Sequence, residues 1–141
     1  MITKAILNLE WLFLIFEKNI KSMNIKEHVI KDSKIAEIIS ESMIIATPED
    51  GLDLLGSLYF QGFDKIVIYQ NNITPDFFDL KTGIAGEILQ KFSNYRVQLA
   101  IIGDFSQYSS KSLQDFIFES NKQGHIIFEE SLDDAIRKFQ K

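Results

Sequence analysis

The chain of 141 residues contains no cysteine, and it has only two prolines and two histidines. The absence of cysteine excludes disulfide bonds, thiolate catalysis and cysteine-ligated zinc, and it fits a protein of the reducing cytoplasm. His28 and His125 are far apart and lack the HExxH spacing of a zinc site. We therefore expect no metal and no other cofactor.

Positive charge is also scarce, because 15 Lys and Arg residues face 20 Asp and Glu residues and give a net charge of -5. A phosphate backbone is bound by a dense Lys/Arg surface, so the composition argues against nucleic acid as the main partner. The content of 45% hydrophobic residues is typical of a globular domain rather than a disordered chain. We expect one domain, over residues 23–141.

Residues 1–22 differ from the rest of the chain. Apolar residues recur at helical spacing from Leu9 to Phe16, which predicts an apolar helix. The run is shorter than the roughly 20 residues of a membrane span, and Glu17 follows where a signal-peptide cleavage site would stand. Two interpretations stay open: residues 1–22 precede a true translation start at Met23, or they form a docking, dimerisation or interfacial helix.

The remaining sequence alternates between strand and helix patterns. Five strands are predicted, at residues 27–31, 35–39, 65–69, 97–102 and 125–128. The first two flank Asp32-Ser33 as a hairpin, whereas KIVIY (65–69) and VQLAII (97–102) lack alternation and are typical of strands covered on both faces.

Helices are predicted to start at hydroxyl N-caps, namely Thr47, Thr74, Ser109 or Ser110, and Ser131. Gly62 and Gly124 are placed to end the first and the third of them. The helix that starts at Thr74 contains Gly83 and Gly86, and an interior glycine costs about 1 kcal/mol relative to alanine. Either a backbone packs closely against these glycines, or the helix begins anew near Thr82.

Two strands followed by helix–strand units predict an α/β fold, with a mixed sheet whose central strands are parallel and whose helices pack on it. Two motifs then resemble the STAS domain, the fold of sulfate transporters and anti-sigma-factor antagonists, over nearly all of residues 23–141. Thr82-Gly83-Ile84-Ala85-Gly86 is similar to that family's Ser/Thr-Gly-Leu-Gly at the start of its second helix. The second motif is the closing strand and helix, with the sequence IIFEESLDDAIRKF.

The runs FFDLKTGIAGEILQKFSNYR and SKSLQDFIFESN resemble a narrower group, a small bacterial family catalogued only as a domain of unknown function, DUF4180. No activity is assigned to that family, so this resemblance implies none for the chain. The STAS resemblance, in contrast, implies a regulatory module that acts through protein contacts.

Thr82 is the residue that this resemblance singles out as a phospho-switch. A hydroxyl at a helix N-terminus lies where free backbone N–H groups and the helix dipole favour an added phosphate. The unmodified face would dock a kinase or regulator, and the phosphate would break the contact. One departure is that switched STAS domains usually carry an acid just before the hydroxyl pair, whereas here Leu80-Lys81 precede Thr82 and Asp79 is displaced by one position. The alternative is that Thr82 only caps or packs.

A second candidate site is the rim at the carboxyl ends of the parallel strands, where ligands bind in open α/β sheets. The candidate residues are Asn71, Asn72, Asp79, Lys81, Gly83, Gly86, Gly103, Asp104, Ser109 and Ser110. The two serines have helix capping as their alternative role. The acids Asp76, Asp79 and Glu87 are not spaced as a metal site, and acids are expected in a first helical turn. The segment from Gly83 to Gly86 lacks the first glycine of a dinucleotide-binding fingerprint.

Two functional classes follow. The first is a non-enzymatic, cytoplasmic regulatory module of STAS-like fold with an unknown protein partner and a possible homodimeric state, because nothing in the sequence places a nucleophile beside a base. The second is a small-molecule or nucleotide-binding protein, possibly an enzyme, that uses the rim.

Overall fold

The computed structural model describes residues 23–140, so the predicted apolar helix in residues 1–22 lies outside the described residues. Five strands form one sheet in the order β1-β2-β3-β4-β5. The strands are β1 (Asn24–Ile30), β2 (Ser33–Ile39), β3 (Lys65–Tyr69), β4 (Gln98–Ile102) and β5 (Ile126–Glu129). Only the first pair is antiparallel, and the other three pairs are parallel.

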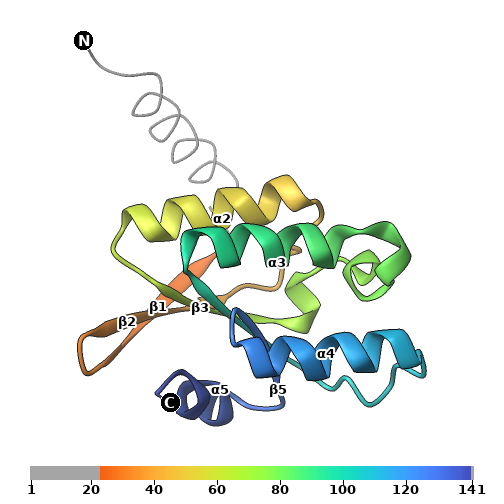
Figure 1. Cartoon of the computed structure of the whole chain (residues 1–141). Helices are drawn as coiled ribbons and strands as arrows, with labels where there is room; N and C mark the ends of the chain where they lie inside the picture. Colours follow the sequence, from red (N-terminus) through yellow and green to blue (C-terminus); the bar gives the residue numbers. More distant parts are fainter. Residues whose placement is uncertain (1–22, 141) are drawn as a thin grey trace.

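Four α-helices of the described chain pack on this sheet (Figure 1). They are α2 (Pro48–Phe60), α3 (Ile84–Tyr95), α4 (Lys111–Gln123) and α5 (Leu132–Phe139). Residues of α2, α3 and α4 bury their apolar sides in one core cluster, while α5 buries Ala135 and Phe139 in a second cluster on the opposite face. The predicted fold class, a mixed sheet with parallel central strands and helices packed on it, is confirmed.

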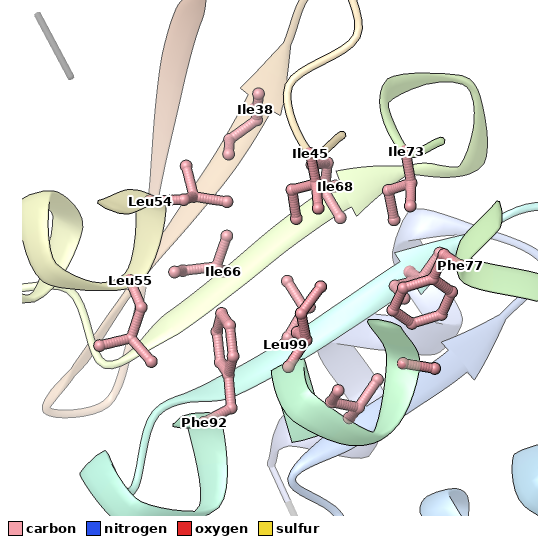
Figure 2. Packing of buried hydrophobic residues seen from close by; sticks show 14 of the residues in the cluster. Ile38, Ile45, Leu54, Leu55, Ile66, Ile68, Ile73, Phe77, Phe92 and Leu99 are labelled. Atoms are coloured by element: carbon pink, nitrogen blue, oxygen red, sulfur yellow. The ribbon is translucent and has the colours of Figure 1, made fainter. Parts of the chain in front are cut away.

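The larger core cluster is formed by branched aliphatic and aromatic side chains of β2–β4 and the helices above them. Figure 2 shows Ile66, Ile68 and Leu99 of the sheet together with Leu54 and Leu55 of α2 and Phe92 of α3. Each of these six residues is at most 1% exposed. Full burial of one such side chain is worth about 1.5–3 kcal/mol, so this cluster contributes strongly to the stability of the fold.

The helix boundaries follow the capping signals of the sequence in three of the four cases. Thr47 and Asp50 form a capping box at α2, and Ser110 and Ser131 accept the N3 amides of α4 and α5. These hydroxyls satisfy backbone N–H groups that have no partner inside the helix. Gly62 and Gly124 have φ values of 96° and 83°, which is the left-handed conformation that was predicted after two helix ends.

The helix predicted to start at Thr74 is the exception, and that prediction is wrong. Two 3₁₀ turns, Pro75–Phe78 and Leu80–Thr82, come first, and α3 begins only at Ile84. Gly83 has φ 79° and separates the second turn from α3, so the alternative in which the helix begins anew near Thr82 is confirmed. The other alternative is wrong, because nothing lies within 4 Å of a Cβ built on Gly83 or Gly86.

Candidate functional site

Thr82 lies at the end of the second 3₁₀ turn, exposed and directly before the residue that caps α3. Its Oγ1 is 2.8 Å from the carbonyl oxygens of both Asp76 and Asp79, so its single O–H donates a hydrogen bond that these two acceptors share. The same oxygen accepts the Ile84 N–H at 3.3 Å. One hydroxyl therefore connects both 3₁₀ turns to the first residue of α3.

The neighbouring candidates share the exposed surface around Thr82. Asp79 accepts the Lys81 N–H through Oδ1 at 3.2 Å, and both side chains are exposed. Gly83 and Gly86 are exposed as well. Because glycine has no side chain, the backbone at the start of α3 is uncovered at these two positions. Asp79, Lys81, Thr82, Gly83 and Gly86 thus form one continuous surface segment, which we call the α3 entry.

Asn71 and Asn72 follow β3 but differ in exposure. Asn71 is exposed, whereas Asn72 is only 1% exposed. The Asn72 amide donates to the carbonyl oxygens of Ser40 and Ser42 at 2.8 and 2.9 Å, and its Oδ1 accepts the Tyr69 N–H at 3.3 Å. The Asn72 side chain therefore holds the loop after β2 against the end of β3, and it does not face a ligand.

Gly103 and Asp104 follow β4 and lie beside the side chain of Gln70. Gln70 accepts the Asp104 N–H at 3.2 Å and donates to the Tyr108 hydroxyl at 2.8 Å. A Cβ on Gly103 would lie 2.3 Å from Gln70 Oε1, so this close contact requires glycine. Hydrogen bonds from Ser106 to Asp104 hold the pKa of this exposed carboxyl below its usual value.

The two serines lie at the start of α4, and both are exposed. Ser110 caps the helix by accepting the Leu113 N–H at 3.2 Å. An aromatic contact joins this region to the α3 entry, because Phe78 stacks on Tyr108 with ring centroids 5.0 Å apart. Buried aromatic side chains and polar contacts within the protein therefore fill much of the predicted rim.

A cavity of about 420 Å³ lies farther along the same edge, at the ends of β4 and β5. Its lining residues are Phe105, Ser106, Gln114, Phe128, Glu129, Glu130 and Asp134. Phe105 belongs to the segment from Gly103 to Phe105 that the sequence places at the rim, and the other six residues were not candidates. Acids after a short strand and in a first helical turn are common for other reasons, so no motif identified them.

Sequence reasoning also missed a hydrogen-bonded cluster across β1, β2 and β3. Glu37, which is 5% exposed, accepts from His28 Nε2 at 2.8 Å and from the Tyr69 hydroxyl at 2.6 Å. Burial raises the pKa of Glu37, but these two hydrogen bonds, together with the attraction of His28 and Lys26, hold the pKa below its usual value. Burial and the same bond raise the pKa of Tyr69 to about 12. The available signal was an acid inside a β-branched run, with a histidine in the hairpin partner two residues beyond Lys26, the cross-strand partner of Glu37.

Two features are absent from residues 23–140. No helix in this range is long and apolar enough to cross a membrane. No group of three or more His, Cys, Asp or Glu side chains in the range is arranged to hold a metal ion.

Comparisons with known proteins give a family and a distant structural likeness. The chain is similar to a crystal structure from Thermotoga maritima, whose protein is provisionally assigned as an anti-sigma factor antagonist. The identity is 9% and the TM-score 0.46, over 83% of this chain and 95% of the other, which is too distant to carry an argument. No curated protein matches the chain. A family model matches residues 30–139, most of the chain. The protein therefore belongs to the family described as Domain of unknown function (DUF4180).

Proposed function

We propose that this protein is a non-enzymatic regulatory module of the cytoplasm, which docks a protein partner through the α3 entry and releases it when Thr82 is phosphorylated. The observation that carries the proposal is the position of the Thr82 hydroxyl. It is exposed, and it is the atom through which two 3₁₀ turns are connected to α3.

A phosphate on Thr82 would change this arrangement in two ways. The ester oxygen has no proton, so the hydrogen bond to the Asp76 or Asp79 carbonyl is lost. The added charge of about -1.5 to -2 would also lie near the Asp76 and Asp79 carboxylates, which repel it, and near the N-terminus of α3, which attracts it. The phosphate therefore favours a new conformation in which it faces the α3 amides and the turns separate from the helix.

The surface around Thr82 is suited to contact with a protein. Gly83 and Gly86 leave the backbone of the first turn accessible, and Lys81 and Glu87 are exposed beside them. Buried Phe77 and Phe78 hold the preceding turn on the core. The α3 entry is thus an exposed segment on a fixed base, a common arrangement for binding loops.

The experiment combines mass spectrometry with a binding comparison. Phosphopeptide mapping of the protein from its native cell should find phosphate on Thr82. A partner isolated with the unmodified protein should bind chain phosphorylated at Thr82 at least about tenfold more weakly, as expected from desolvated like charges at an interface.

Three variants separate a docking role from a structural one. Thr82→Ser keeps the hydroxyl and should keep partner binding, whereas Thr82→Glu should weaken it. Ser110→Ala removes a comparable helix cap at α4 and should lower stability without changing partner binding. No phosphate at Thr82 and equal partner binding by all variants would refute the proposal.

A further inference from the structure

The connections that leave β4 and β5 go to opposite faces of the sheet. After β4 the chain forms α4, whose Leu113 and Ile117 pack in the larger core cluster. After β5 it forms α5, whose Ala135 and Phe139 pack in the cluster on the other face. In open α/β sheets, a crevice opens where neighbouring strands send their connections to opposite faces, and ligands bind there.

The cavity of about 420 Å³ lies at this point, and both connections line it. Phe105, Ser106 and Gln114 come from the β4–α4 side, and Phe128, Glu129, Glu130 and Asp134 come from the β5–α5 side. The volume is within the range of small-molecule sites. The cavity thus lies where the chain segments after β4 and after β5 pass to opposite faces of the sheet.

The lining of the cavity determines which ligands it favours. Glu129, Glu130 and Asp134 contribute three carboxylates, and no Lys, Arg or His is among the lining residues. Asp134 pairs with the exposed Arg137 at 3.5 Å, whereas no ion pair joins Glu129 or Glu130 to a cation within residues 23–140. A phosphate would be repelled, and a cation would be attracted.

Two buried aromatic rings supply an apolar surface beside these acids. Phe105 and Phe128 pack edge to face, with centroids 5.2 Å apart and an interplanar angle of 90°. Gln114 donates to the carbonyl oxygens of Phe105 and Tyr108, at 3.0 and 2.9 Å, which fixes the wall next to the rings. Aromatic rings with carboxylates around them favour an organic cation that has an apolar body.

We propose that the crevice between β4 and β5 binds a small organic cation, with an ammonium or guanidinium group held by Glu129 and Glu130 and an aliphatic part on Phe105 and Phe128. The proposal narrows the sequence-based alternative of a small-molecule or nucleotide binder, because the carboxylates disfavour nucleotides. It does not depend on Thr82, so either proposal can fail alone.

The test is titration of the full chain with agmatine and with putrescine at low salt, followed by calorimetry and by NMR amide shifts. The expected result is saturable binding of at least one amine, with shifts centred on residues 105–106 and 128–134. AMP and inorganic phosphate should not bind at this place. Absence of saturable amine binding, or shifts centred elsewhere, would overturn the proposal.

A matched pair of double variants controls for simple charge effects. Glu129→Gln/Glu130→Gln should raise the Kd at least about tenfold, as expected when the partner charges of a ligand are removed. Asp115→Asn/Glu119→Gln removes the same charge from exposed positions of α4 and should leave the Kd within about twofold. An equal rise of the Kd in both double variants would contradict a specific site. The single variant Glu130→Gln, at an exposed position, gives the same comparison if the first double variant does not fold.

Discussion

The Tyr69 hydroxyl donates a hydrogen bond of 2.6 Å to Glu37, which is the one charged side chain among residues 23–140 that is buried. A buried carboxylate that loses a donor retains the cost of its lost hydration. This bond therefore links the central strand β3 to the β1–β2 hairpin through β2.

Tyr69→Phe should destabilise the protein by about 1–3 kcal/mol, because one bond to a buried charge is removed. Urea unfolding at pH 7 measures the change. Tyr95→Phe, at a position 55% exposed, is the control and should change stability by less than about 0.5 kcal/mol. Equal effects of both substitutions would contradict the role given to the Tyr69 hydroxyl.

The stability of the protein should depend on pH through both Tyr69 and Glu37. The pKa of Tyr69 is raised from 10.0 to about 12, so its contribution is present below pH 10 and is lost as the pH rises through about 12. The pKa of Glu37 is lowered from 4.5, so its contribution is present above that pH and is lost as the pH falls through the lowered value. Unfolding free energies across pH should therefore show a smaller difference between wild type and Tyr69→Phe at the alkaline end. A difference that stays constant to pH 12 would contradict this assignment.

Gly103→Ala and Gly86→Ala should have opposite effects on stability. A Cβ on Gly103 would lie 2.7 Å from the Gln70 Cβ, so the backbone must shift and the cost should be about 1–3 kcal/mol. A Cβ on Gly86 meets nothing within 4 Å inside a helix, so alanine should stabilise by about 0.5–1 kcal/mol. Thermal or urea unfolding of the two variants checks both signs.

Asn72→Ala should destabilise the protein by about 2 kcal/mol or more, because the carbonyl oxygens of Ser40 and Ser42 lose the donors that hold them. Hydrogen exchange should rise in residues 40–46, since the loop after β2 loses its attachment to β3. If exchange there is unchanged while global stability falls, the amide does not hold this loop.

Local signals predicted most of the fold. The caps at Thr47, Ser110 and Ser131 are short-range hydrogen bonds, so a few residues of sequence contain them. The KIVIY run matches β3 residue for residue, because a strand buried on both faces is apolar throughout. The start of α3 was misplaced because Thr74-Pro75-Asp76 carries the same capping signal as a true α-helix start.

The candidate site was less predictable, because it depends on contacts between distant residues. The sequence did not show that Asn72 turns inward to reach Ser40, or that Gln70 lies against Gly103. The crevice between β4 and β5 depends on α4 and α5 lying on opposite faces, which their own amphipathic patterns do not specify. Thr82 was singled out from its motif, and its predicted modification remains a prediction.

The central claim is that the Thr82 hydroxyl connects the turns before α3 to that helix and that a phosphate breaks the connection. The most direct measurement is hydrogen exchange of the full chain with and without phosphate incorporated at Thr82. The account predicts faster exchange in residues 74–83 of the phosphorylated chain, with no change in β3 and β4. Identical exchange of residues 74–83 in both forms would contradict it.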